Sequence, residues 1–392
     1  MKHICFVVDS IFTIGGVQRV TAVIAKGLAY EYDVTIVTFD SEDQKDLSMY
    51  ELNESNIHFR YVSYPNIGKF KQLLSKVYSG IYIKMRLHGK KWSDLYARSS
   101  FPSELRKAIV TELQSGNYDI IIGVHAPLAS RLATLKKYLG RTMVFGWIHN
   151  SFEALFDKNS LYIGEERKRH YVYQFKKLDK VILLCKHDIE TYKKYDPTFY
   201  PTYIYNPLTL IPSTKSNGTT KTFLAIGRFS HLHKGFDILI KAFAQFAKTN
   251  KEWNLEIVGE GVEEELYRSL IDNYGLKKRV YIHPFTNNIQ IYYSNAQIYV
   301  LSSRWEGFGL VLVEAMAHGL PIISSDLPTS KEILGELGLY FKNGDILELA
   351  KRLEEATRID WQEKSRQAIE IAKEYDIKNI ITQWKALIEN EN

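Results

Sequence analysis

The chain has 392 residues, of which 45% are hydrophobic and 24% charged, a composition that excludes wholesale disorder and suits two or three domains of ~100–200 residues each. Lysine plus arginine exceeds aspartate plus glutamate by 51 − 45 = 6, too small an excess to indicate nucleic-acid binding by itself. Cys5 and Cys185 lie in apolar runs, and two cysteines form neither a disulfide framework nor a zinc cluster. Asp9 interrupts the first apolar run, and no stretch approaches the roughly 18 apolar residues of a membrane-spanning helix. We therefore expect a soluble, cytoplasmic protein.

The first half of the chain alternates short apolar runs with helix-length spacers. The runs predict strands at 3–8, 33–39, 118–124, 142–148 and 180–184, and a helix near 17–30 follows the break at Gly15-Gly16. Apolar runs rich in valine and isoleucine, separated by helices, are typical of a parallel sheet that is covered on both faces. Residues 1–205 are therefore predicted to form one doubly wound, Rossmann-like domain.

Residues 206–221 contain two prolines, a glycine and many polar residues without periodicity, which indicates a linker. After it the alternation restarts, with strands predicted at 222–227, 255–259, 279–282 and 297–301 and helices near 235–248, 262–273 and 288–295. We predict a second Rossmann-like domain over 206–375, and so an α/β protein whose two doubly wound domains face a cleft. Ligands of such sheets bind at the carboxyl ends of the strands.

The end of the chain, 376–392, contains one predicted amphipathic helix. Its apolar residues at 377, 380, 381, 384 and 387 are spaced for a single face. Two placements are open, because the helix could pack on the second domain or back on the first.

Residues 304–321, RWEGFGLVLVEAMAHGLP, combine acidic residues with a glycine-flanked helix start. Glu306 precedes Gly307-Phe308-Gly309, and the N–H groups at the start of the following helix favour an anion. Glu314 lies about five residues into that helix, roughly 7 Å along its axis, which suits a carboxylate that accepts the hydroxyls of a ribose. An ordinary strand–loop–helix turn with a buried glutamate explains these residues about equally well.

Basic residues follow an earlier predicted strand of the same domain. Residues 226–237, IGRFSHLHKGFD, place Arg228 at the strand end and Lys234 just before a helix. An arginine forks onto phosphate oxygens, and a lysine supplies a point charge. Either residue alone is more simply a solvated cation, but together with the glycine-flanked helix start they favour a diphosphate site.

These motifs resemble the retaining glycosyltransferases of family 4, which have the GT-B fold. The resemblance runs over essentially the whole chain and is carried by Gly15-Gly16-Val17-Gln18-Arg19-Val20, Trp147-Ile148-His149-Asn150, Tyr205-Asn206-Pro207, Gly227-Arg228 with Lys234-Gly235, and Glu306-Gly307-Phe308-Gly309 through Glu314-Ala315. It implies a hexosyltransferase whose second domain binds a nucleotide-sugar donor, and we expect UDP as the nucleotide. The acceptor it implies is a glycan or a lipid-linked sugar of a cell-surface polysaccharide such as capsule or lipopolysaccharide.

The resemblance also implies roles for single residues. Arg228 and Lys234 match the cations that neutralise the donor diphosphate, and Glu314 matches the glutamate that holds the ribose. Glu306 matches the glutamate at the donor sugar. The remaining donor-binding positions are Gly15, Gly16, Gly227, Gly307, Phe308, Gly309 and Leu310. His149 matches a histidine on the acceptor side, where a strand-end histidine that only caps backbone is the alternative.

Charge predicts the mechanism of such an enzyme. Negative charge develops on the diphosphate as it leaves. Arg228, Lys234 and the helix N–H groups are placed to stabilise that charge. The resemblance implies retention of configuration through attack on the same face. The chain has no Asp-x-Asp triplet, so we predict no metal and no other cofactor.

One segment of the first domain is basic and amphipathic. From Ser55 to Ser93 there is no acidic residue, while aromatic and aliphatic residues alternate with eight cations. Such a stretch fits contact with an anionic membrane surface, for which we name Lys84, Arg86, Lys90 and Lys91. A helix with a solvated lysine face is the alternative, and nucleic acid is disfavoured because no binding motif accompanies the charge.

Two other functions stay open at this point. One is another sugar-nucleotide enzyme of the same fold, such as an epimerase or a disaccharide synthase. The other is a non-catalytic subunit that supports a partner transferase, although the presence of Glu306, Glu314, Arg228 and Lys234 argues against it. Gly259-Glu260-Gly261 lacks the third glycine of the dinucleotide fingerprint, which disfavours a dehydrogenase.

Overall fold

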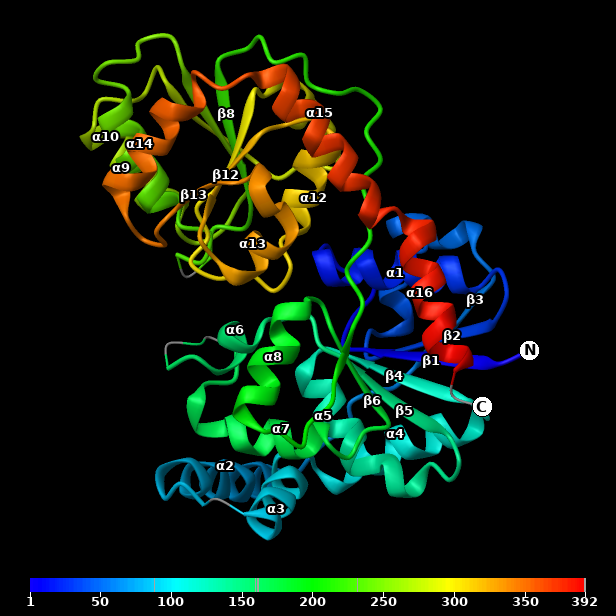
Figure 1. Ribbon diagram of the computed structural model, residues 1–392. Helices are drawn as coiled ribbons and strands as arrows, with labels where there is room; N and C mark the ends of the chain where they lie inside the picture. Colours follow the sequence, from blue (N-terminus) through cyan, green and yellow to red (C-terminus); the bar gives the residue numbers. More distant parts are fainter. Residues whose placement is uncertain (88, 159, 161, 231, 391–392) are drawn as a thin grey trace. The chain divides into compact units, whose positions relative to one another are not determined.

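The computed structural model describes residues 1–87, 89–158, 160, 162–230 and 232–390. The chain divides into two compact units (Figure 1). The first unit comprises residues 1–205 and the end of the chain from Ile380, and the second unit comprises residues 206–379.

The first unit contains a parallel sheet of seven strands in the order β3-β2-β1-β4-β5-β6-β7. The strands are β1 (His3–Val8), β2 (Asp33–Thr38), β3 (Ile57–Tyr61), β4 (Ile120–Val124), β5 (Met143–Trp147), β6 (Lys180–Leu183) and β7 (Thr202–Tyr203). The five strands predicted from apolar runs are all present. The sequence pattern missed β3 and β7 because edge strands need no continuous apolar run, and β3 contains His58 and Arg60.

Helices cover this sheet. They are α1 (Gly16–Leu28), α2 (Lys69–Lys84), α3 (Lys90–Ser100), α4 (Ser103–Ser115), α5 (Ala126–Leu135), α6 (Phe152–Phe156), α7 (Lys168–Phe175), α8 (Lys186–Tyr195) and α16 (Ile377–Glu389), with short 3₁₀ turns at Glu42–Gln44, Met49–Glu54, Lys136–Tyr138 and Glu165–Arg167. Helix α5 lies close to β4 and β5, since a Cβ at Gly146 would stand 2.9 Å from the Cβ of Ala129. Glycine in these two strands therefore lets the helix approach the sheet.

Helices α2 and α3 lie side by side next to α7 (Figure 1). The rings of Tyr82 on α2 and Tyr96 on α3 stack with their centroids 4.3 Å apart. Ser93 of α3 is 2.8 Å from Nδ1 of His170 on α7, and both side chains are buried. Burial lowers the pKa of His170 to about 3, so the imidazole is neutral at physiological pH. A buried polar contact thus attaches the α2–α3 hairpin to the body of the unit.

Helix α16 packs on the first unit, which resolves the two placements left open by its sequence. Its buried Trp384 lies 4.9 Å from the ring of Trp147 and 6.4 Å from that of Phe6. A Cβ on Gly27 would stand 2.4 Å from Cδ1 of Ile381, so α16 also approaches α1 closely. The chain therefore ends on the unit in which it begins.

The second unit contains a parallel sheet of six strands in the order β10-β9-β8-β11-β12-β13. The strands are β8 (Thr222–Ile226), β9 (Asn254–Val258), β10 (Val280–His283), β11 (Ile298–Leu301), β12 (Ile322–Ser325) and β13 (Leu339–Phe341). The helices are α9 (Phe236–Phe246), α10 (Glu264–Asn273), α11 (Gln290–Asn295), α12 (Leu310–Ala317), α13 (Pro328–Leu334), α14 (Ile346–Ala356) and α15 (Trp361–Ala372), with 3₁₀ turns at Gly335–Leu337 and Lys373–Tyr375. The sequence pattern missed β12 and β13, which are only four and three residues long; β12 also ends in two serines.

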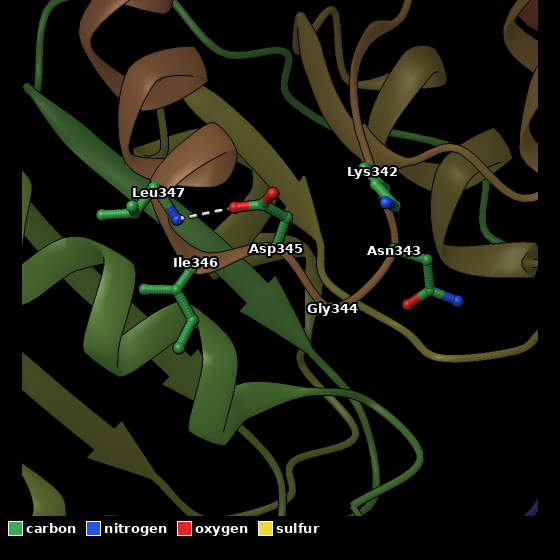
Figure 2. Close-up of a pocket in the computed structure, with 6 residues that line it drawn as sticks. All are labelled: Lys342, Asn343, Gly344, Asp345, Ile346 and Leu347. Atoms are coloured by element: carbon green, nitrogen blue, oxygen red, sulfur yellow. Dashed lines mark hydrogen bonds between the residues drawn. The ribbon is translucent and has the colours of Figure 1, made fainter.

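A shallow pocket of about 430 Å³ lies at the turn between β13 and α14 (Figure 2). The carboxylate of Asp345 accepts the backbone N–H groups of Leu347 and Glu348, at 3.0 Å each. Asp345 is thus the N-cap of α14, and its acceptor capacity is used to start the helix. This turn has a structural role.

Candidate functional site

The candidate donor residues of the second unit follow two neighbouring strands. The strand order reverses between β8 and β11, which is where open α/β sheets bind ligands. Arg228 and Lys234 come after β8, and the segment from Ser302 to Gly309 comes after β11. The sheet therefore brings the two sequence motifs to one place.

Lys234 and Glu306 form an ion pair at the centre of this site. Nζ of Lys234 donates to Oε1 of Glu306 at 2.6 Å, and the two side chains are 15% and 7% exposed. The hydroxyl of Ser303 donates to the same carboxylate oxygen at 2.5 Å. The stem of Lys234 packs over Gly227, where a Cβ would stand 2.8 Å from Cγ of the lysine. These contacts hold the ammonium in a fixed position.

Neighbouring charges decide the ionisation of Glu306. Burial raises its pKa, but Lys234, His233 and the hydrogen bonds from Lys234 and Ser303 outweigh burial, so the pKa lies below its ordinary value. His233 stacks on Trp305 with ring centroids 4.9 Å apart, and burial followed by Lys234 lowers the pKa of its imidazole. At neutral pH the site therefore holds an ionised glutamate and a neutral histidine.

Arg228 differs from Lys234 in its surroundings. Its side chain is exposed, and within the part of the chain that the structure describes it forms no ion pair. It lies near enough to His233 to lower the pKa of that imidazole. Arg228 is thus a cation with its charge available, whereas the charge of Lys234 is balanced by Glu306.

Two helices begin at this site on left-handed glycines. Gly235, before α9, has φ +63°, and a Cβ there would stand 2.0 Å from the carbonyl oxygen of Ser302. Gly309, before α12, has φ +86°. A side chain at either position would strain the backbone, and at Gly235 it would also separate the two loops. The glycines bring the loop after β8 against the loop after β11.

Glu314 lies within α12 and is buried. Its Oε2 accepts a hydrogen bond of 2.9 Å from the hydroxyl of Tyr293 on α11. The ring of Tyr293 stacks on His318 at 4.7 Å, and Nδ1 of His318 is 2.7 Å from the backbone oxygen of Glu314. The tyrosine therefore orients the carboxylate. Of the other predicted donor positions, Gly307 and Leu310 are half-buried, while Phe308 is buried against Tyr375.

Arg304 and Asp237 are site residues that sequence reasoning missed. Nη1 and Nη2 of Arg304 donate to the two carboxylate oxygens of Asp237, at 2.8 and 2.9 Å. The backbone N–H of Arg304 also donates to the carbonyl oxygen of His233 at 2.8 Å. The pair fastens the loop after β11 to the first turn of α9, and it was missed because its members stand 67 positions apart in the sequence.

In the first unit, Gly15 and Gly16 lie at the loop between β1 and α1. The backbone N–H of Gly15 donates to the hydroxyl of Tyr50 at 2.9 Å, and that hydroxyl donates to the carbonyl oxygen of Thr13 at 2.8 Å. Tyr50 therefore holds the loop in shape. The first turn of α1 has no acidic residue, so its positive end is uncompensated by a carboxylate there.

His149 follows β5 and is buried beside a second histidine. Its ring lies 4.2 Å from Trp147 and 5.5 Å from His125, measured between centroids. Burial, and then His125, lowers the pKa of His149 well below its ordinary value. Its buried Nε2 has no hydrogen-bond partner among the described residues. A neutral imidazole whose Nε2 has no partner among the described residues can form a hydrogen bond with the hydroxyl group of a ligand.

His125 is a second residue that sequence reasoning missed. It follows β4 and has φ +79°, a strained value for a residue other than glycine. Burial lowers the pKa of its imidazole, partly offset by Asp9. Strain of this kind at the end of a central strand is a common feature of functional sites. Its position directly after the apolar run IIIGV places it at the carboxyl end of a predicted strand, and this could have marked it as a candidate site residue from the sequence.

The four basic residues predicted to meet a membrane come together at the turn between α2 and α3. Lys84 ends α2, Arg86 lies in the turn, and Lys90 and Lys91 begin α3; all four are exposed. Large apolar side chains of the same hairpin are exposed as well, namely Phe70, Leu73, Leu74, Val77, Ile81, Met85, Trp92 and Leu95. No helix in the described part of the chain is both long and apolar enough to span a bilayer.

Residues 209–375 match the family described as glycosyl transferases group 1. The match covers most of the second unit and less than half of the whole chain. The two Rossmann-like units have the GT-B fold of similar solved structures, as predicted.

Similar proteins agree with this class. An uncharacterized glycosyltransferase of Haemophilus influenzae is 29% identical over 405 residues, which cover 99% of this chain and 100% of that protein. The lipopolysaccharide core biosynthesis mannosyltransferase LpsB of Rhizobium meliloti is 29% identical over 179 residues, 43% of this chain and 48% of that protein. The crystal structure of Anabaena Alr3699/HepE in complex with UDP and glucose has a TM-score of 0.76 at 19% identity and covers 100% of both chains. These findings support a glycosyltransferase.

Proposed function

We propose that the protein is a retaining glycosyltransferase of family 4, which transfers a hexose from a nucleotide-sugar to a glycan or a lipid-linked acceptor in cell-surface polysaccharide synthesis. The observation that carries this proposal is the set of Arg228, the Lys234–Glu306 pair and Glu314 around the point where the sheet order reverses. The relationship to LpsB, whose name refers to the lipopolysaccharide core, supports the class of acceptor.

The donor diphosphate binds Arg228 and Lys234 in this proposal. Arg228 has no ion pair to break within the described chain, so it is the first partner for a phosphate oxygen. Lys234 is already held by Glu306, and a bound phosphate shares the ammonium with that carboxylate. As the diphosphate leaves, both cations and the N–H groups from Gly307 to Leu310 stabilise the growing negative charge.

Two glutamates position the rest of the donor. Glu314, oriented by Tyr293, accepts the ribose hydroxyls, while Glu306 lies toward the sugar. We propose UDP as the nucleotide, supported by the complex of HepE with UDP and glucose.

On the acceptor side, His149 forms a hydrogen bond with the attacking hydroxyl group of the acceptor. Its neutral imidazole and its unpartnered Nε2 suit a hydrogen bond with an acceptor group. Gly15 and Gly16, in the loop held by Tyr50, belong to the donor-binding residues in this proposal.

We further propose that the enzyme acts at an anionic membrane surface, from the cytoplasmic side. Exposed cations at the α2–α3 turn stand beside the exposed apolar side chains of Met85 and Trp92, which are 66% and 46% exposed. This pairing suits an interfacial hairpin, in which apolar groups enter the lipid and cations meet the head groups.

A donor-hydrolysis screen tests the proposal. The full chain is incubated with several nucleotide-sugars, with and without EDTA, and release of free nucleoside diphosphate is measured. We expect release from a UDP-sugar that is insensitive to EDTA, since the two cations take the place of a metal clamp. Loss of activity in EDTA that magnesium or manganese restores would contradict metal independence.

The same screen separates the alternatives. An epimerase converts one nucleotide-sugar into another without releasing nucleoside diphosphate, and a disaccharide synthase needs a free sugar as its acceptor. A non-catalytic subunit binds donor at most weakly and hydrolyses none. Absence of nucleoside diphosphate from every donor, with or without added sugars, would overturn the transferase.

A further inference from the structure

A basic pocket lies in the first unit, and its lining includes none of the residues assigned above to the donor or the acceptor. It has a volume of about 440 Å³. Its lining comes from four segments: α3, α4, the end of α5 with its following 3₁₀ turn, and the residues after α7. The polar residues that line it are Asp94, Arg98, Arg106, Thr134, Lys136, Lys137 and Lys177. We call this the basic pocket.

Positive charge in the basic pocket exceeds the negative charge available to it. Lys177 forms an ion pair with Asp94, and Lys136 forms one with Asp179 at 2.5 Å. Within the described part of the chain, Arg98, Arg106 and Lys137 have no carboxylate partner. Five cations and one carboxylate therefore line the cavity, and of the three cations without a carboxylate partner among the described residues Arg106 is half-buried while Arg98 and Lys137 are exposed.

Arg106 shows this imbalance at the level of one atom. Its Nε is buried and has no hydrogen-bond partner among the described residues. A buried guanidinium N–H without an acceptor is unfavourable, because it has lost water and gained nothing in return. Arg106 is also the fourth residue of α4, near the positive end of the helix dipole, where a cation is disfavoured although Glu104 lies in the same turn. An anion bound by this guanidinium would offset both effects.

The crowding of cations is visible in a neighbouring side chain. The Lys137 ammonium stands 4.7 Å from the centroid of the Tyr138 ring. Lys137 first, and then Arg106 and Arg98, lower the pKa of the Tyr138 hydroxyl, which is exposed. Tyr138, which follows the lining residue Lys137 in the chain, thus responds to the positive charge of three lining residues.

The geometry points to a phosphate group as the ligand. We propose that the basic pocket binds a phosphate monoester, held by Arg98 and Arg106 with Lys137 at the rim. A phosphate monoester carries a charge of about −1.5 to −2 at neutral pH, which suits three unbalanced cations better than a single carboxylate does. Two arginines can fork onto its oxygens. Since Arg98 belongs to the exposed α2–α3 hairpin, the phosphate can come from a lipid head group or from a free phosphate ester.

Two measurements on the full chain test the basic pocket and distinguish these sources. The first titrates inorganic phosphate by calorimetry at constant ionic strength, in wild type and in Arg228→Ala, because phosphate can also enter the donor site. The second compares binding to vesicles containing phosphatidic acid, a monoester, with vesicles of phosphatidylglycerol, a diester, at matched surface charge. Phosphate binding that persists in Arg228→Ala indicates that the basic pocket takes a free phosphate ester. Preference for phosphatidic acid vesicles indicates that it takes a lipid head group.

The decisive variant is Arg98→Ala/Arg106→Ala. Its matched control is Lys107→Ala/Lys194→Ala, which removes the same charge from two exposed lysines of the same unit outside the pocket. We expect the pocket variant to weaken whichever binding is seen by roughly tenfold or more, since charge-assisted hydrogen bonds are lost, and the control to change it little. Equal losses in both variants, or no binding of either probe by wild type, would overturn the proposal. Near-ultraviolet circular dichroism confirms that each variant is folded.

Discussion

At the scale of single residues, Lys234 and Glu306 form a charged pair that is largely removed from water. Such a pair adds little net stability, because desolvation of two ions offsets their attraction, but the loss of one partner leaves an unbalanced buried charge. Arg228 stands in the same site without such a partner in the described chain. The two cations should therefore respond differently to removal.

We predict that Arg228→Ala lowers kcat by ~10²–10³-fold, the effect of losing one donor to developing charge, and leaves the melting temperature unchanged. The temperature is expected to hold because the side chain is exposed. Steady-state kinetics with the donor found in the screen, together with thermal melting, check this. Lys215→Ala, which removes an exposed lysine of the same unit, is the control and should retain activity. Wild-type turnover by Arg228→Ala would mean that the diphosphate binds elsewhere.

Lys234→Ala should lose stability as well as activity. Leaving the buried Glu306 unpaired costs ~3–5 kcal/mol, whereas Lys234→Ala/Glu306→Gln should regain much of that loss without regaining activity. The folded-state pKa of Glu306 is lowered, so the pair stabilises fully above the unfolded pKa of ~4.3 and less as pH falls through the folded value. Urea unfolding at neutral and acidic pH measures this. Equal stability of Lys234→Ala and wild type at neutral pH would contradict it.

At the scale of elements, the α2–α3 hairpin differs from the rest of the first unit because it exposes many large apolar side chains. Its contacts with the body include the buried Ser93–His170 pair, while much of its apolar surface faces outward. Exposed apolar patches of this kind usually mark an interaction site. The hairpin therefore combines a firm attachment with a surface that is free to bind.

His170 makes this attachment sensitive to acid. Burial lowers the folded-state pKa of His170 to about 3 from 6.5. The contribution of the neutral imidazole to the free energy of unfolding is therefore complete above pH 6.5 and is lost as the pH falls toward 3. We expect His170→Gln to flatten the pH dependence of the free energy of unfolding by up to ~1.4 kcal/mol per pH unit in that window. Urea unfolding followed across pH checks it. His58→Gln, at an exposed histidine, is the control, and the same slope for wild type and His170→Gln would contradict the prediction.

Neutralising Lys84, Arg86, Lys90 and Lys91 together should release the protein from anionic vesicles. The surface attraction of exposed cations is screened within roughly 8–10 Å at physiological salt, so wild-type binding should also weaken as salt rises. Donor hydrolysis should remain intact, because these residues lie in the first unit and the donor cations in the second. Vesicle co-sedimentation at low and high salt measures both effects.

The control for that experiment is the same number of neutralised lysines away from the hairpin, for which Lys107, Lys158, Lys194 and Lys215 are exposed. Equal sedimentation of both variants and wild type, or none by any of them, would leave the hairpin as a solvated helix face and favour a soluble acceptor.

At the scale of the whole molecule, the chain returns to its starting unit through α16. Trp384→Ala should destabilise the first unit by ~3–5 kcal/mol, because a fully buried tryptophan leaves a cavity beside Trp147 and Phe6. Thermal melting measures the loss. Lys385→Ala, which removes a surface ion pair with Glu31, should change stability by at most ~1 kcal/mol. Equal melting temperatures for the two variants would mean that α16 is not needed for the stability of this unit.

Much of the fold follows from local sequence. Strands β1, β4 and β5 are continuous apolar runs because parallel strands are buried on both faces, and such runs can be read without any partner. The order of motifs likewise marks Arg228, Glu306 and Glu314 as candidates, since residues at strand ends and helix starts are local features. Strands β12 and β13 were not predicted because runs of four and three residues are too short to show a pattern, and they become strands by pairing with each other and with β11.

Tertiary structure alone decided what those residues meet. The pairing of Lys234 with Glu306 joins positions 72 apart, and the arginines of the basic pocket face lysines from other helices only after the chain has folded. The placement of α16 was equally undetermined, because an amphipathic face specifies that a helix packs but not on which surface. Periodicity and turn chemistry are encoded by neighbours along the chain, whereas charge balance, burial and the choice of packing partner arise from residues distant in sequence.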